Sequence, residues 1–246
     1  MTSKIESIIN GIAERRSLAG VTRRPISGDQ IPSMPTALSV MEALGKRRNP
    51  KFRIDDHNRW TYTQLIKWLY GIPDMMALDP DAAAQGKMRT IPAKLTAGIY
   101  IGGSTGTGKS WALEMLNIFA DIDTPIINLG DKATPIHYGC IRAEDIWEAC
   151  TTNDAILSRY KTMPILCIQD LGSEPVSDAV RMGTRREPLR QILEARGDRN
   201  DLITLITSNF GICDPEIERR YTDRVVSRLR EMCNMLAITG PDRRRL

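Results

Sequence analysis

Apolar residues along this chain follow two patterns, which predict two kinds of element. Continuous apolar runs are typical of strands buried on both faces of a sheet. Such runs lie at residues 97–101, 164–168, 202–206 and 235–238, with less regular candidates at 125–127 and 136–141. Apolar residues three and four positions apart predict amphipathic helices at 58–71, 110–120, 143–150, 184–193 and 214–229. Because strands alternate with helices, we expect a parallel sheet with helices on both faces.

Three local signals refine this outline. Residues 20–36 contain prolines and glycines and are typical of a linker. Residues 72–95 are rich in Pro, Asp and Ala, and we expect them to loop over the surface. The sequence Thr184-Arg185-Arg186-Glu187 fits a capping box and predicts the start of a helix there.

The N-terminal part forms an arm with its own charge. Isoleucines at helical spacing in residues 5–12 predict an amphipathic helix, and residues 37–44 predict a second short one. Residues 1–53 hold ten basic and four acidic residues, a balance of +6 against +4 for the whole chain. We therefore divide the chain into a basic arm, 1–50, and a core, 51–246. The arm can contact nucleic acid or an acidic protein, or remain a solvated leader, and its helix can dock on the core or on a partner.

Composition excludes several classes of protein. The chain has 246 residues, of which 41% are hydrophobic and 26% charged, as in ordinary globular proteins. No apolar run approaches the roughly 18 residues of a membrane span, and the start lacks a secretory pattern. Five cysteines occur without a C-x-x-C motif, which argues against a zinc site or disulfide framework. We expect a cytoplasmic protein that does not contact membranes.

The most specific motif lies between a predicted strand and a predicted helix. Residues 103–110 fit G-x-x-x-x-G-K-[ST], the phosphate-binding P-loop. Backbone N–H groups of such a loop and the helix N-terminus bind phosphate. We expect the lysine to reach the β- and γ-phosphates of ATP and the final serine to hold Mg²⁺. The predicted nucleotide-binding residues are Gly103, Ser104, Thr105, Gly106, Thr107, Gly108, Lys109 and Ser110.

Polar residues also follow two other buried strands. Gln169 and Asp170 come after the strand at 164–168, and Asn209 follows the strand at 202–206. Ligands of parallel sheets bind outside the carboxyl ends of the strands. We therefore expect these side chains and the P-loop to meet at one edge of the sheet.

With these motifs in place, residues from about 52 to 244 resemble AAA+ ATPases of the DnaC/IstB type, which are bacterial helicase loaders and transposase helpers. Residues 165–174 are similar to the family's Walker B segment, and Thr207-Ser208-Asn209 resembles sensor 1. Residues 224–229 resemble the arginine-finger box, and 240–244 the terminal arginine motif. A weaker match places residues 52–56 beside the adenine. The resemblance implies a P-loop NTPase three-layer sandwich, an α/β fold with a central parallel sheet and no C-terminal helical lid.

The resemblance also implies roles for single residues. Arg228 falls on the arginine finger, which acts from a neighbouring subunit, and Arg244 lies near the phosphates. Asp170 polarises the attacking water and Asn209 positions it, while Ser110 and Asp170 are the expected metal ligands. Without a lid, nucleotide is held between subunits, so we expect an ATP-dependent homo-oligomer.

The chain departs from the family at the first Walker B acid, which is Gln169 here. A neutral amide brings no charge to Mg²⁺, so we expect slow ATP hydrolysis. In a competing interpretation, Asp170 takes over the metal role and Glu174 supplies the base.

The predicted function is an ATP-binding switch that acts in DNA replication on a replicative helicase or another DNA-processing protein, with single-stranded DNA as a further possible partner. The alternatives are an IstB-like transposition helper, a P-loop kinase for a small metabolite, and a nucleotide-bound scaffold that does not hydrolyse ATP.

Overall fold

The computed structural model describes residues 20–23, 31–175, 179–181 and 184–244. The predicted helix at residues 5–12 lies outside these ranges. The division into arm and core at residue 50 stays a prediction, although the first described helix, α2 (Met34–Arg48), packs into the main hydrophobic core through Ala37 and Met41.

The central sheet has seven strands in the described residues, and five of them run parallel. Their order is β3-β2-β12-β4-β11-β8-β7. The bounds are β2 (Met76–Leu78), β3 (Thr90–Pro92), β4 (Gly98–Gly102), β7 (Cys140–Arg142), β8 (Ile165–Leu171), β11 (Ile203–Ser208) and β12 (Cys233–Ala237). β4 and β11 are completely buried, which explains why both strands are rich in apolar residues.

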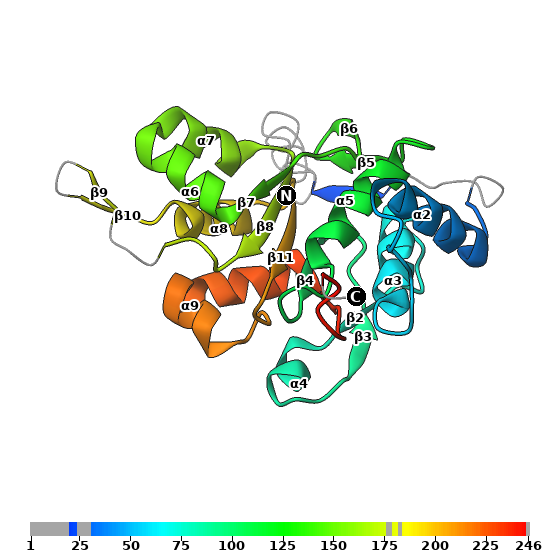
Figure 1. Cartoon of the computed structure of the whole chain (residues 1–246). Coiled ribbons are helices and arrows are strands. Elements are labelled where there is room, and N and C mark those ends of the chain that lie inside the picture. Colours follow the sequence, from blue (N-terminus) through cyan, green and yellow to red (C-terminus); the bar gives the residue numbers. More distant parts are fainter. Residues whose placement is uncertain (1–19, 24–30, 176–178, 182–183, 245–246) are drawn as a thin grey trace, which may run out of the picture.

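Helices cover both faces of this sheet and make three layers (Figure 1). One face carries α2, α3 (Arg59–Tyr70) and α5 (Lys109–Ala120), and their apolar side chains form one hydrophobic cluster with the sheet. The other carries α6 (Ala143–Thr152), α7 (Asp154–Thr162), α8 (Pro188–Gly197) and α9 (Pro215–Met232), which form a second cluster. The predicted P-loop NTPase sandwich is confirmed.

Local chemistry accounts for two of the helix ends. Gly71 ends α3 in the left-handed conformation, with φ of 66°. Asp214 caps α9, because its carboxylate accepts a hydrogen bond from the backbone N–H of Glu216.

Three sequence predictions are wrong where short strands pair. The stretch 72–95 contains β2, the helix α4 (Pro80–Ala84) and β3, and both strands extend the sheet antiparallel at its edge. The linker 20–36 contains β1 (Val21–Arg23), which pairs with β5 (Ile126–Leu129), itself paired with β6 (Lys132–Pro135). The capping box at 184–187 is instead β10 (Thr184–Arg186), paired with β9 (Ala179–Arg181), and α8 starts at Pro188. Strands of three or four residues are too short to show a period.

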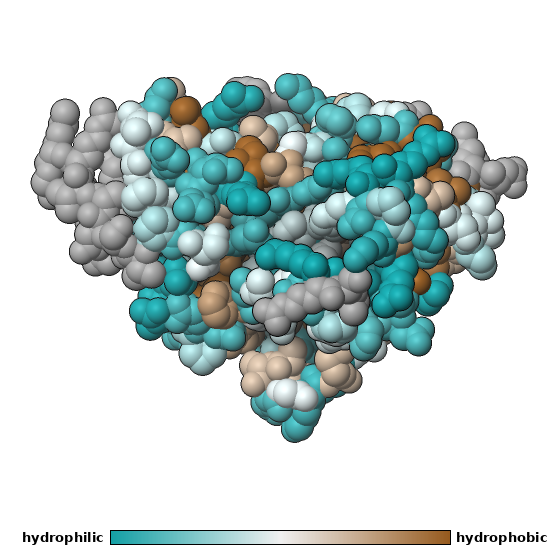
Figure 2. All heavy atoms as spheres, viewed as in Figure 1, coloured by the Kyte–Doolittle hydropathy of each residue, from teal (hydrophilic) through white to brown (hydrophobic). Residues whose placement is uncertain are grey.

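The face seen in Figure 2 is covered mostly by hydrophilic residues, with hydrophobic ones in small separate groups. Large hydrophobic side chains that are exposed in the described ranges are Met88, Ile91 and Ile122. No helix within those ranges combines the length and apolar character that crossing a bilayer requires.

A buried arginine joins the second helical layer to the sheet. Arg196 of α8 is 1% exposed. Its guanidinium donates to the carbonyls of Tyr160, Met163 and Ile203 and to the Thr204 hydroxyl. Buried carbonyls need partners, and this side chain satisfies acceptors at the end of α7 and at the start of β11.

We predict that Arg196→Met lowers the free energy of unfolding by about 3 kcal/mol or more, because it leaves these buried acceptors unpaired. Urea denaturation measures the change. Arg190→Met is the matched control on the same helix, since Arg190 makes surface ion pairs with Glu187 and Glu194 that contribute at most about 1 kcal/mol. Equal losses in the two variants would contradict the structural role of Arg196.

Candidate functional site: a P-loop cavity

The P-loop connects β4 to the start of α5. Gly106 and Gly108 have φ of 79° and 99°, values that side chains disfavour. A Cβ at Gly106 would also overlap the carboxylate of Asp242. Glycine is therefore required here both by the turn and by the close approach of the C-terminal tail.

Lys109 is the cation at the centre of the site and is 5% exposed. Its Nζ donates to the Ser104 carbonyl at 2.8 Å and to Oδ1 of Asn209 at 2.9 Å. Burial lowers the pKa of Lys109, the Asp170 charge opposes this shift, and the Arg244 charge adds to it. An ammonium has three N–H donors, of which these neutral acceptors take two.

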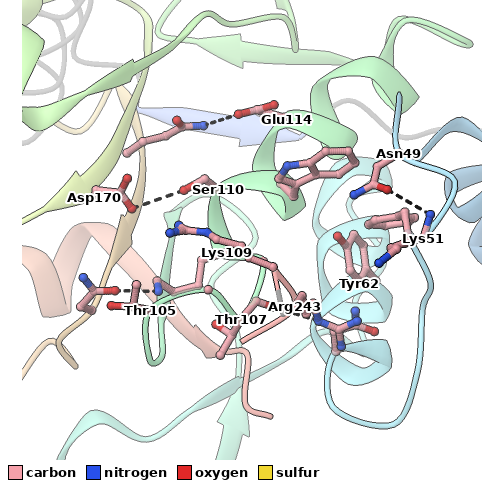
Figure 3. Close-up of a pocket in the computed structure, with 18 of the residues that line it drawn as sticks. Asn49, Lys51, Tyr62, Thr105, Thr107, Lys109, Ser110, Glu114, Asp170 and Arg243 are labelled. Atoms are coloured by element: carbon pink, nitrogen blue, oxygen red, sulfur yellow. Dashed lines mark hydrogen bonds between the residues drawn. The ribbon is translucent and has the colours of Figure 1, made fainter. Parts of the chain in front are cut away.

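Asp170 faces the end of the P-loop. Its Oδ1 lies 3.4 Å from Oγ of Ser110 (Figure 3). The backbone of Asp170 is left-handed, with φ of 55°, and its N–H donates to the Thr207 hydroxyl at 2.9 Å. The register between β8 and β11 shifts at this point. This local irregularity turns the carboxylate toward Ser110, and backbone outliers of this kind cluster at functional sites.

Gln169 has a different neighbour from Asp170. Its Nε2 donates to Oε1 of Glu114 at 3.0 Å, while Arg48 donates to Oε2 of the same carboxylate at 2.8 Å. Both Gln169 and Glu114 line the cavity. The residue at the first Walker B position thus contacts α5 and not Ser110.

The P-loop opens into a cavity of about 640 Å³. An aromatic group forms one wall: Phe52 stacks on Trp111 with ring centroids 5.4 Å apart, and the Tyr62 ring meets Phe52 edge-on at 6.1 Å. Figure 3 shows Tyr62, Asn49 and Lys51 on the side of the view away from Asp170. An aromatic wall at one end and a phosphate loop at the other match the two ends of a nucleotide.

The C-terminal tail folds over the P-loop (Figure 1). The backbone N–H of Arg243 donates to the Gly106 carbonyl, and its Nε donates to the Thr107 carbonyl at 3.1 Å. Nη2 of Arg243 also bonds Asp55 at 2.7 Å, which joins three distant parts of the chain. Arg244, the predicted phosphate contact, lines the cavity.

Arg228 and Glu174 are not among the described residues that line the cavity, and neither are Gly103 and Ser104 at the start of the P-loop. Arg228 bonds Asp198 and Glu231 of the same chain and packs on Gly197. Its role as a finger in a neighbouring site therefore stays a prediction. Glu174 is buried, and its carboxylate accepts hydrogen bonds from the Tyr221 hydroxyl and the Gly172 N–H. This position argues against Glu174 as the catalytic base.

Sequence reasoning did not single out several residues of the cavity, of which Trp111, Glu114 and Arg243 are the most informative. The others are Asn49, Lys51, Asn58, Tyr62, Arg142 and Ser173. Trp111 and Glu114 follow Ser110 by one and four positions on α5. The position of Glu114 was a signal that could have found it, because residues four apart share one helical face. Arg243 lay inside a recognised motif, but its contacts depend on how the tail folds.

The oxygen atoms near Ser110 suit Mg²⁺. No group of three His, Cys, Asp or Glu that could hold a metal occurs in the described part of the chain. Magnesium at nucleotide sites, however, binds one or two carboxylates, the substrate phosphates and several waters. Ser110 and Asp170 provide a hydroxyl and a carboxylate 3.4 Å apart, and this donor set fits the ion.

Comparison with known proteins identifies the fold. No family profile and no curated protein matches the chain by sequence. Among solved structures, the DnaC helicase loader is similar with a TM-score of 0.53 and 17% identity, over 77% of this chain and 94% of that one. Domain III of the replication initiation protein DnaA from Thermotoga maritima has a TM-score of 0.48 and 17% identity, over 78% and 67%. The chain therefore has the fold of a DnaC-like AAA+ domain.

Proposed function

We propose that this protein is an ATP-binding AAA+ switch that acts in DNA replication. The observation that carries the proposal is the buried Lys109, which is held between the Ser104 carbonyl and Asn209 and lines a cavity of nucleotide size. The fold shared with the DnaC helicase loader supports a role at a replicative helicase or another DNA-processing protein. Its place of action would be the cytoplasm. Affinity capture with and without ATP identifies the partner.

In this proposal the site works by placing positive charge around the triphosphate. Lys109 binds the β- and γ-phosphates, and the P-loop N–H groups bind the oxygens between them. Ser110 and Asp170 would hold Mg²⁺, which would neutralise part of the phosphate charge. Asn209 keeps Lys109 in place and orients the attacking water. Arg228 of a neighbouring subunit completes the charge neutralisation, so ATP would promote assembly of a homo-oligomer.

Hydrolysis in this site would be slow. Asp170 is the one Walker B carboxylate beside Ser110 among the described residues, because Gln169 is neutral and bonded to Glu114. A carboxylate that holds the metal and a carboxylate that activates water occupy different positions around the γ-phosphate. A single side chain, Asp170, does not occupy both positions at once. A long-lived ATP state suits a switch that remains on its partner.

We predict that Lys109→Ala weakens ATP binding by roughly 100-fold or more, because the site loses its buried cation at the phosphates. Isothermal titration calorimetry measures the affinity. Lys87→Ala, which removes an exposed lysine outside the cavity, is the control and should bind ATP normally. Unchanged affinity in Lys109→Ala would reject the proposed site.

Variants of Arg243 and Arg244 should distinguish an effect on stability from an effect on ATP binding. Arg243→Ala removes the bonds to the P-loop and Asp55, so we expect a lower melting temperature without nucleotide. Arg244→Ala should leave that temperature unchanged and weaken ATP binding by about tenfold, the loss of one charged contact. Differential scanning fluorimetry and calorimetry on both variants test this. The reverse pattern would show that the roles are exchanged.

Arg228→Ala should spare ATP binding but reduce ATP-dependent assembly and lower turnover by about 10³-fold, because a finger acts in trans. Size-exclusion chromatography with ATP and single-turnover hydrolysis provide the readouts. Mixing this variant with Lys109→Ala should restore part of the turnover, since some interfaces then combine an intact P-loop with an intact finger. Wild-type behaviour of Arg228→Ala in both assays would reject the assignment.

A further inference from the structure

Glu114 is an acidic residue inside the cavity for which the proposed mechanism has no role. It lies on α5 four positions after Ser110, so both residues point from the same face of the helix. Its two carboxylate oxygens have separate donors, Gln169 on Oε1 and Arg48 on Oε2. Figure 3 shows the bond to Glu114 beside the bond between Asp170 and Ser110. The side chain is thus fixed in the cavity.

The two donors do not exhaust the carboxylate. An ionised carboxylate offers about four lone-pair sites, so acceptor capacity remains for water. The Arg48 side chain is 47% exposed, and an ion pair in such a place is screened by solvent. Glu114 therefore retains both negative charge and free lone pairs.

The partner of Glu114 explains the residue at position 169. Gln169 is 7% exposed and donates an N–H to Glu114. An acid at position 169 would have no N–H to donate and would place a second negative charge about 3 Å from the first, which is unfavourable in a buried place. The two residues are therefore complementary: Glu114 on α5 carries the negative charge, and Gln169 on β8 carries the N–H donor.

We propose that Glu114 positions the water shell of the nucleotide-bound Mg²⁺ and that Gln169 orients Glu114 for this task. The inference rests on the proposed ATP site and adds the source of its second carboxylate. Magnesium keeps several waters when it binds at phosphates, and carboxylates beside it accept hydrogen bonds from these waters. Charge that β8 lacks at position 169 is provided by α5.

The test compares the Mg²⁺ dependence of ATP binding in matched variants. Glu114→Gln keeps the size and one acceptor oxygen but removes the charge, and we expect the Mg²⁺ concentration for half-maximal binding to rise about tenfold. The exchange variant, Glu114→Gln with Gln169→Glu, moves the charge back to the strand. It should return the Mg²⁺ concentration for half-maximal binding most of the way to the wild-type value. Glu148→Gln, on an exposed site of α6, is the control for loss of a distant charge and should behave as the wild type.

Arg48→Met separates this role from a purely structural ion pair. If Glu114 serves only to join α2 to α5, Arg48→Met and Glu114→Gln should lower the melting temperature alike and leave the Mg²⁺ midpoint unchanged. We expect the melting temperature to fall in both variants and the Mg²⁺ midpoint to rise in Glu114→Gln alone.

The outcomes distinguish this inference from the proposed function. If the wild-type protein binds no ATP at any Mg²⁺ concentration, the proposed function fails and the inference fails with it. If the wild type binds Mg²⁺-ATP but Glu114→Gln has the wild-type midpoint, or the exchange variant restores nothing, the inference alone is overturned.

Discussion

The burial of a positive charge at Lys109 is the interaction on which the site depends. An ammonium taken out of water needs oxygen partners, and it finds them in the Ser104 carbonyl and the side chain of Asn209. Ser104 belongs to the P-loop, whereas Asn209 follows β11, so the contact requires these neighbouring strands to be in register. β4 and β11 pair in parallel along four residues and end together. The arrangement of the sheet therefore decides where the charge can be satisfied.

Two long-range connections close the cavity around this charge. Arg243 joins the C-terminal tail to the P-loop and to Asp55. On the other side, Phe52 packs on Trp111, and Gly45 of α2 leaves room for the Phe52 ring, since a Cβ there would overlap it. The first connection holds the tail on the P-loop, and the second holds Phe52 on α5. Loss of either connection would disturb the cavity, and loss of the Arg243 side chain would also leave the Thr107 carbonyl of the P-loop without this donor.

The distribution of negative charge in the cavity differs from what the strand alone suggests. β8 contributes Asp170 and a neutral Gln169, while α5 contributes Glu114 one helical turn after Ser110. A carboxylate and an amide that share a hydrogen bond can exchange places between strand and helix without changing the net charge of the site. A sequence motif defined on one strand includes only the acidic residues of that strand. It does not include acidic residues, such as Glu114, that other elements place in the same cavity.

The layered fold could be predicted from the sequence alone, because the long helices show their period over many residues and the buried strands are short runs rich in apolar residues. The sequence also located the P-loop and the polar residues Asp170 and Asn209, since the carboxyl ends of parallel strands meet at one edge. Short elements such as β1 and β2 depended on tertiary structure, because three residues show no period and their hydrogen bonds come from distant partners, β5 and β12. The same holds for Glu114 and Arg243. Their residue types were visible in the sequence, but the partners that give them a place in the site, Gln169 and Asp55, are neighbours only after folding.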